Sequence, residues 1–295
     1  MSQPNVHPAA LPSAHTADQL RLRPGARESV TVDPSLAGWR YLSFRALRLG
    51  AGEELELAPG LEHGIVVIEG GAAAVDCAGR RLVLEGRPNP FDVAPSACYV
   101  PAGRGASVSG AGALVAVGSA LPSGRAGAAH SPVLIERSDV RIEVRGAGNA
   151  TRQINHIIEP SFPADRLLMV EVLTPSGNWS SWPPHKHDID DMPHEAVLEE
   201  TYYYRFRRPA AWAVQRLYRG DRSRDYLWEV RSGEVVMVTD GYHPFVAAHG
   251  DDAYYLNALA GDRRTMACSF DADLDWVRGE WAGMAPDPRV PLTRP

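Results

Sequence analysis

The chain has 295 residues, of which 44% are hydrophobic and 22% charged, as is typical of a globular protein with a substantial core in one large domain or two. The formal net charge is −6 and no basic cluster occurs, which argues against binding to nucleic acid or to an anionic membrane. The three cysteines are far apart and form no CxxC pair, so neither a disulfide framework nor a zinc–thiolate site is indicated.

The N-terminal residues contain no basic segment followed by an apolar run, and the most apolar stretches are shorter than the roughly 18 residues that cross a bilayer. We therefore expect a cytoplasmic protein without a membrane partner. Residues 1–20 are rich in Pro, Ala and Ser without periodicity, and we expect them to form a mobile leader.

Short apolar or alternating runs separated by Gly, Pro and Asp fill residues 21–120, a pattern typical of many short strands. Residues 121–150 are polar, contain Pro and Gly, and are expected to form a linker. The strand pattern returns in residues 151–280, and residues 281–295 are expected to be a C-terminal tail. The sequence thus predicts an all-β protein with little helix.

The two halves can also be aligned with each other. The segment "SACYVPAGRGASV" (96–108) resembles "EVVMVTDGYHPFV" (234–246), and "HGIVVIEGG" (63–71) takes the place of "LEETYYYRF" (198–206). In this alignment Gly105 falls where the second half has His243, and His63 has no histidine two residues later. A repeat of this size predicts two stacked β-barrels that arose by duplication, with polar chemistry in the second barrel alone.

The stretch "SSWPPHKHDIDDMP" (180–193) carries two histidines, His185 and His187, on either side of the only lysine of the chain. Because alternate side chains of an extended strand point to one face, both imidazoles should project inward while Lys186 points away. An H-x-H pair of this kind can bind one metal ion, although on its own it is weak evidence.

Two further residues strengthen the case for a metal site. Glu200 opens "ETYYYRF", a strongly β-forming run, and His243 follows the turn "TDGYHP", in which Gly241 permits a tight reversal. Three imidazoles and one carboxylate suit Zn, Mn, Fe, Co or Ni, and they leave coordination positions for water or substrate.

H-x-H, a later Glu that opens a strand, and a later Gly-turn-His resemble the two metal-binding motifs of the cupin superfamily. More narrowly, "NWSSWPPHKHD", "LEETYYYRF", "QRLYRGDRSRD", "DGYHP" and "YYLNALAG" resemble the 5-deoxy-glucuronate isomerase family, bicupin enzymes of myo-inositol catabolism related to the pectin-pathway uronate isomerases. The resemblance runs from about residue 20 to residue 276. It implies a bicupin fold, with a metal-free first barrel and a metal-binding second barrel.

The resemblance also implies which residues bind the divalent metal ion, namely His185, His187, Glu200 and His243. The sequence departs from the general cupin pattern because the gap between His187 and Glu200 is longer and the second motif is one residue shorter. The neighbouring Glu199 and the nearby Glu195 are therefore alternatives for the carboxylate ligand.

The activity that the resemblance implies is aldose–ketose isomerisation of 5-deoxy-D-glucuronate to 5-dehydro-2-deoxy-D-gluconate, by proton transfer or by a hydride shift. The substrate carboxylate calls for an arginine, for which Arg216 and Arg222 are favoured by strand parity. Further candidates for binding the sugar acid are Tyr202, Tyr204, Gln215, Tyr254 and Asn257. The sequence does not single out a catalytic acid or base.

Three alternatives remain open from the sequence. They are isomerisation of the pectin-derived 5-dehydro-4-deoxy-D-glucuronate, an iron-dependent dioxygenase, and a sugar-binding bicupin without catalysis. The polar, tyrosine- and arginine-rich strands favour a sugar acid over an aromatic substrate. Exposed edge strands would allow a homo-oligomer.

Overall fold

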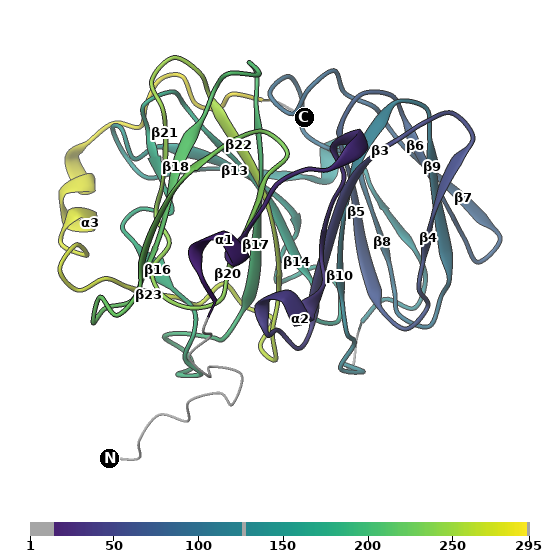
Figure 1. Cartoon of the computed structure of the whole chain (residues 1–295), viewed down its shortest axis with the longest axis horizontal. Helices are drawn as coiled ribbons and strands as arrows, with labels where there is room; N and C mark the ends of the chain where they lie inside the picture. Colours follow the sequence, from purple (N-terminus) through teal and green to yellow (C-terminus); the bar gives the residue numbers. More distant parts are fainter. Residues whose placement is uncertain (1–14, 126–127, 294–295) are drawn as a thin grey trace.

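The computed structural model describes residues 15–125 and 128–293, and it consists of two β-barrels side by side (Figure 1). The expected leader lies largely outside the described residues. In the part of the chain that is described, the helices are single turns, and none is long and apolar enough to cross a membrane. They are α1 (Ala17–Leu20), α2 (Pro34–Ala37), α3 (Val277–Glu280) and the 3-10 turns Ala26–Glu28, Arg137–Asp139 and Trp281–Gly283.

The N-terminal barrel is built from two sheets. The larger sheet has the strand order β11 (Val133–Ile135), β8 (Ala97–Val100), β5 (Glu62–Glu69), β10 (Ala113–Ala120), β3 (Leu42–Leu49) and β2 (Val30–Val32). The smaller sheet has the order β4 (Glu53–Leu57), β9 (Ala106–Gly110), β6 (Ala73–Cys77) and β7 (Arg80–Leu84). Neighbouring strands in both sheets run antiparallel.

The C-terminal barrel repeats this plan. Its larger sheet has the order β1 (Arg21–Leu22), β20 (Val235–Val238), β17 (Glu199–Phe206), β22 (Ala253–Ala260), β14 (Leu168–Thr174), β13 (Arg152–Ile158) and β12 (Arg141–Arg145). The smaller sheet runs β15 (Trp179–Ser180), β21 (Phe245–Ala247), β18 (Ala213–Tyr218) and β19 (Asp225–Val230), and β16 (His185–Lys186) pairs with β23 (Ser269–Phe270). The shared order β8-β5-β10-β3 and β20-β17-β22-β14 confirms the all-β, two-barrel fold.

The structure draws the boundaries between the halves differently from the sequence expectation. β1, from the start of the first half, pairs with β20 of the second barrel. Within the expected linker, β11 pairs with β8 of the first barrel and β12 pairs with β13 of the second. The expected tail is also held, because Thr293 is buried and its backbone N–H donates to the side-chain oxygen of Gln153.

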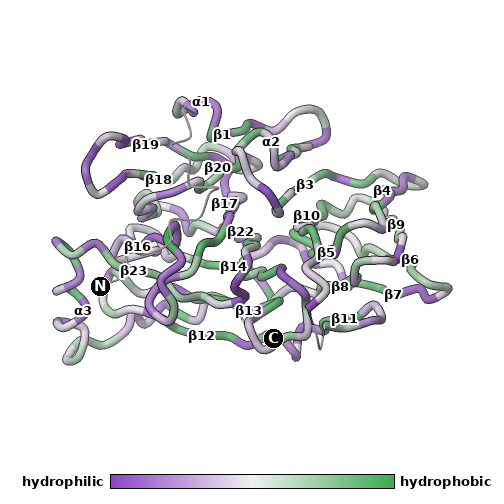
Figure 2. Tube along the Cα trace, turned by 90° about the horizontal axis from the view of Figure 1, so that it is seen from below, coloured by the Kyte–Doolittle hydropathy of each residue, from purple (hydrophilic) through white to green (hydrophobic). Residues whose placement is uncertain are grey.

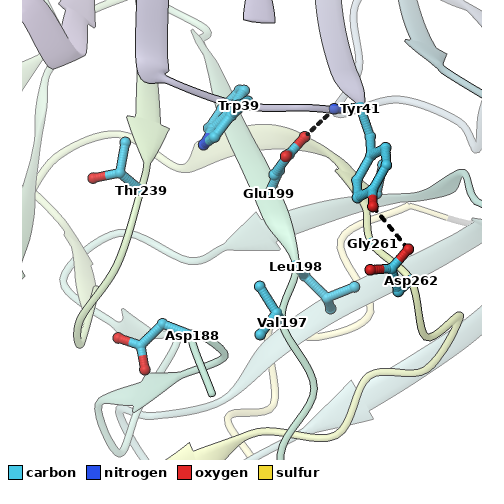
Figure 3. A pocket seen from close by; sticks show the side chains of 10 residues that line it. Trp39, Tyr41, Asp188, Val197, Leu198, Glu199, Thr239, Gly261 and Asp262 are labelled. Carbon is cyan, nitrogen blue, oxygen red and sulfur yellow. Dashed lines mark hydrogen bonds between the residues drawn. The ribbon is translucent and has the colours of Figure 1, made fainter. Parts of the chain in front are cut away.

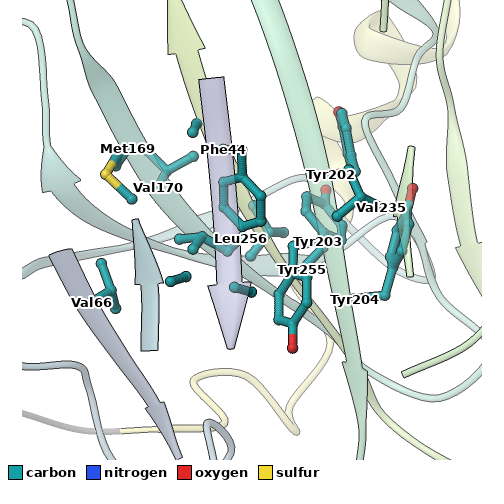
Figure 4. Packing of buried hydrophobic residues seen from close by; sticks show 14 of the residues in the cluster. Phe44, Val66, Met169, Val170, Tyr202, Tyr203, Tyr204, Val235, Tyr255 and Leu256 are labelled. Atoms are coloured by element: carbon teal, nitrogen blue, oxygen red, sulfur yellow. The ribbon is translucent and has the colours of Figure 1, made fainter. Parts of the chain in front are cut away.

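The interior of the N-terminal barrel is filled by apolar side chains, among them Ile65, Val67, Val108 and Val115. A second and larger core joins the two barrels, where Phe44 packs against Tyr203 with ring centroids 5.7 Å apart (Figure 4). Hydrophobic segments accordingly lie along the central strands, and many of the peripheral loops are hydrophilic (Figure 2). Apolar packing thus fills most of the first barrel and continues into the contact between the barrels.

Alternation along β17 divides its side chains between these two environments. Tyr203 faces the first barrel, whereas Tyr202 and Tyr204 pack against Tyr255 inside the second barrel. Because successive side chains of a strand point to opposite faces, Glu200 shares the inner face with Tyr202, and Glu199 shares the outer face with Tyr203.

Candidate metal centre

The H-x-H segment is a short extended piece held at both ends. His185 lies in β16 opposite Phe270, and His187 follows directly after this strand. The backbone N–H of Leu198 donates to the carbonyl oxygen of His187 at 3.0 Å, and the Nδ1 of His187 hydrogen-bonds the carbonyl oxygen of Leu198 at 2.9 Å. The segment before β17 therefore fixes the orientation of the His187 ring.

Lys186 points away from the two imidazoles and braces the loop that follows. Its Nζ donates to Asp188 at 2.6 Å and to both carboxylate oxygens of Glu195 at 2.9 and 3.0 Å. Glu195 also accepts the backbone N–H groups of Asp188 and Ile189 at 2.7 and 2.8 Å. The carboxylate of Glu195 is thus used in closing the acidic loop, and the lysine supplies the counter-charge.

Three residues predicted as ligands come together within the second barrel. Ligand atoms of His187, Glu200 and His243 all lie within 4.8 Å of one another, and all three residues are buried. The Oε2 of Glu200 lies 2.9 Å from Nε2 of His187 and 3.4 Å from Nε2 of His243. His185 stands beside this group, with its ring centroid 4.6 Å from that of His243 and 6.3 Å from that of His187.

The ring nitrogens are arranged as metal ligation requires. The Nδ1 atoms of His187 and His243 face the carbonyl oxygens of Leu198 and Gly241 at 2.9 and 3.0 Å. These nitrogens therefore carry the ring protons, and each Nε2 is directed to Glu200. The Nε2 of His243 is buried and has no hydrogen-bond partner among the described residues, so two acceptors face each other there. A cation between them would satisfy both.

Burial and neighbouring charges set the protonation of the three rings. Burial holds the pKa of His243 down at about 4, and burial together with the adjacent His243 and His187 holds the pKa of His185 well below its usual range. Burial also lowers the pKa of His187, but the hydrogen bond and charge of Glu200 outweigh it and raise the pKa overall. A metal ion at this carboxylate would replace the proton on His187.

Glu199, the alternative carboxylate, serves a different purpose. It accepts the backbone N–H groups of Arg40, Tyr41 and Leu42 at 2.6, 2.9 and 2.7 Å, and Figure 3 shows it directed to the segment that enters β3 of the first barrel. Its carboxylate is therefore engaged at the contact between the barrels, on the opposite face of β17 from Glu200.

Glu62 makes the matching contact from the first barrel. It opens β5 as Glu199 opens β17, and it accepts the backbone N–H groups of residues 165, 166 and 167, which lead into β14, at 2.8, 2.6 and 2.8 Å. The next residue, His63, pairs with Val100 as Glu200 pairs with Val238, so the structure matches His63 with Glu200, two residues from its place in the sequence alignment. Its two ring nitrogens bond Ser119 Oγ at 2.7 Å and the carbonyl oxygen of Ala58 at 2.9 Å, which leaves no nitrogen for a metal.

A cavity of about 460 Å³, measured with its opening to solvent, adjoins the His/Glu group. His185, Glu200, Tyr202 and Asn257 line it, so it collects four of the residues singled out in the sequence.

Five other residues that the sequence suggested for substrate binding lie elsewhere. The hydroxyl of Tyr204 donates to Gln215 at 3.0 Å in the packed interior, and that of Tyr254 donates to the buried Glu171 at 2.7 Å. Arg216 pairs with Asp225 near the surface, and Arg222 lies over the ring of Tyr218. Neither arginine lines the cavity beside the His/Glu group.

The sequence reasoning missed Arg145, Arg152, His156, Ser181 and Tyr255, which also line the cavity. Arg152, Ile154 and His156 alternate along β13 and share its inner face, so the run "RQINH" carried a signal. This run lies near the histidines because β13 is next to β14 in the sheet order β22-β14-β13, and no local sequence pattern predicts that order.

Two stacked barrels with a buried His/Glu group in the second define a bicupin protein. The chain belongs to the KduI/IolB family, whose model matches residues 17–277. It is 42% identical over 250 residues, 84% of this chain and 90% of the relative, to a protein of Geobacillus kaustophilus named 5-deoxy-glucuronate isomerase. A relative of the same name from Listeria monocytogenes serovar 1/2a is 33% identical over 87% of this chain and 94% of its own length.

Solved structures agree with this placement. The structure is similar to that of an IolB-like protein from Salmonella typhimurium LT2, with a TM-score of 0.83 and 35% identity over 88% of this chain and 99% of that one. A mutant of Bacillus subtilis oxalate decarboxylase shares the fold alone, with a TM-score of 0.59 and 13% identity over 85% of this chain and 79% of that one.

Proposed function

We propose that the protein is a metal-dependent aldose–ketose isomerase that converts 5-deoxy-D-glucuronate to 5-dehydro-2-deoxy-D-gluconate. The observation that carries the proposal is the buried group of His187, Glu200 and His243 beside a polar cavity, in a chain whose relatives bear the name of this isomerase. A storage protein would tolerate loss of the metal-binding residues from both barrels, whereas here the second barrel keeps His187, Glu200 and His243 together.

His185, His187, Glu200 and His243 would hold a divalent ion, with Zn, Mn, Fe, Co and Ni all suited to such nitrogen and oxygen ligands. When bound, the ion would polarise the substrate carbonyl and stabilise the negative charge that develops on the oxygens of the two carbons between which the proton moves. The facing acceptor atoms of His243 and Glu200 support a cation at this point rather than a purely structural hydrogen bond.

The protein itself supplies the orientation of the sugar. A chain of hydroxyls borders the cavity, because Ser181 Oγ lies 2.9 Å from the hydroxyl of Tyr202 and 3.4 Å from that of Tyr255. Such hydroxyls can donate to and accept from the sugar hydroxyl groups. Asn257, whose amide donates to the carbonyl oxygen of Thr201 at 3.1 Å, holds its side chain in a fixed direction at the same wall.

The test is turnover of 5-deoxy-D-glucuronate by protein loaded with each of the five metals, followed by NMR of the sugar. We expect conversion that a chelator abolishes and added metal restores. Parallel assays with 5-dehydro-4-deoxy-D-glucuronate measure the preference between the two uronates. Tight binding of the sugar without any conversion by the metal-loaded protein would contradict the enzyme assignment.

A further inference from the structure

Arg152 is a buried cation without a carboxylate partner. The residue is 6% exposed, and its one hydrogen bond within the described structure is from NH1 to the carbonyl oxygen of Ala150 at 3.2 Å. A guanidinium carries five N–H donors, so most of its donor capacity is unused by the protein. Burial lowers the pKa of Arg152 to about 10, which still leaves it charged at neutral pH.

The other deeply buried arginines each have a carboxylate partner. Arg87 pairs with the equally buried Glu171, and Arg224 pairs with Asp240. A buried charge is ordinarily compensated in this way because isolating it from water is costly. Among the described arginines that are less than a tenth exposed, Arg152 is thus the exception, and the exception lies at the cavity.

The position of Arg152 suits an anionic ligand. It shares the inner face of β13 with His156, and it lines the same cavity as His185 and Glu200. Its neighbour across the sheet is Arg145, which also lines the cavity but is already engaged by Glu143 at 2.6 Å. The two arginines give this wall of the cavity positive charge.

We propose that Arg152 binds the carboxylate of a sugar-acid substrate at the end remote from the reacting carbonyl, with Arg145 adding long-range attraction. A guanidinium binds a carboxylate through two parallel N–H···O bonds, and the carboxylate of the ligand would neutralise the charge of Arg152, which has no carboxylate partner within the described protein. The inference rests on the proposed function for the identity of the substrate, and it makes Arg152 the residue that selects acids over neutral sugars.

The experiment compares Arg152→Met, which keeps much of the side-chain bulk without the charge, with Arg152→Lys, which keeps the charge without the planar guanidinium group. We expect kcat/KM for the uronate to fall on the order of 100-fold in Arg152→Met and by less in Arg152→Lys. The neutral analogue, with a hydroxymethyl group in place of the carboxylate, should lose less than about 3-fold because it makes no ion pair. Arg141→Met, an exposed arginine on β12 paired with Glu159, is the matched control.

Binding to metal-free protein separates this inference from the proposed function. Calorimetry with an unreactive aldonic acid should show affinity that Arg152→Met reduces about 100-fold and Arg141→Met leaves unchanged. Equal acid affinity and equal turnover in Arg152→Met and the wild type would overturn the inference while leaving the isomerase intact. Arg152-dependent acid binding without any turnover by the metal-loaded wild type would refute the isomerase and retain the carboxylate site. Thermal denaturation checks folding, since loss of an unpaired buried cation should not lower stability.

Discussion

Glu199 and Glu200 are adjacent in the chain, yet their carboxylates serve opposite faces of β17, so replacing each one separately tests the division of roles. Glu199→Ala removes the acceptor of three backbone N–H groups of the first barrel. Each N–H left without a partner costs about 1–3 kcal/mol when it is buried. Partial relaxation and access of water reduce the sum, and we expect the free energy of unfolding to fall by about 3–5 kcal/mol.

For a chain of this size, about 1 kcal/mol corresponds to about 2 °C in Tm, so Glu199→Ala should melt about 6–10 °C below the wild type. Its bound metal, measured by elemental analysis at permissive temperature, should remain at the wild-type ratio. Glu200→Gln is the control, because the amide fills the same volume and leaves the contact between the barrels untouched. It should lose metal and activity, with a Tm close to that of the metal-free wild type.

The melting temperatures of both variants are measured on metal-free protein by calorimetry, so that bound metal does not add to the stability of one variant alone. Two results would refute the reasoning. One is a Glu199→Ala protein that melts with the wild type, and the other is a Glu199→Ala protein that loses its metal while Glu200→Gln keeps it.

Three further predictions concern the metal, the acid response and the packing. His243→Ala should lower metal affinity and kcat by a factor of at least about 100, which titration with a metal indicator checks. Burial raises the pKa of Glu143, but the hydrogen bond and charge of Arg145 outweigh burial and lower the pKa to about 2. The ionised Glu143 therefore stabilises the fold above the unfolded pKa near 4.5, and this stabilisation is lost as the pH falls toward 2. Glu143→Gln should therefore lower the urea midpoint at pH 7 more than at pH 3. Gly64→Ala places a methyl group 2.3 Å from Met169 Sδ at the contact between barrels, and the free energy of unfolding should fall by about 1–3 kcal/mol without loss of metal.

The fold was predictable because its signals are local and repeated. Strand-length apolar runs bounded by Gly and Pro predicted the β class, and the likeness of residues 96–108 to residues 234–246 predicted the duplicated barrel. Strand exchange was not predictable in this way. The pairing of Arg21 with Val236 joins residues more than 200 positions apart, and β1 is only two residues long, too short for a hydrophobic periodicity that would predict the pairing.

The site was predictable where residues of one strand share a face. Alternation placed Glu200 and Tyr202 together, and the cavity contains both. The positions of the arginines relative to the cavity were harder to predict, since Arg216 and Arg222 are near the metal motifs in sequence but lie outside the cavity lining. Arg152 reaches the cavity through its place in the sheet, at the far side of β14, and only the order of strands reveals this.

The reciprocal contacts of Glu62 and Glu199 bear on how the molecule could be divided. Each glutamate opens a strand in one barrel and satisfies three backbone N–H groups of the other. A gene cut between the halves would leave these carboxylates and amides without their protein partners and would expose the apolar core that the barrels share, so neither product should persist as a soluble monomer. The N-terminal barrel is therefore a structural support on which the folding of the C-terminal barrel depends.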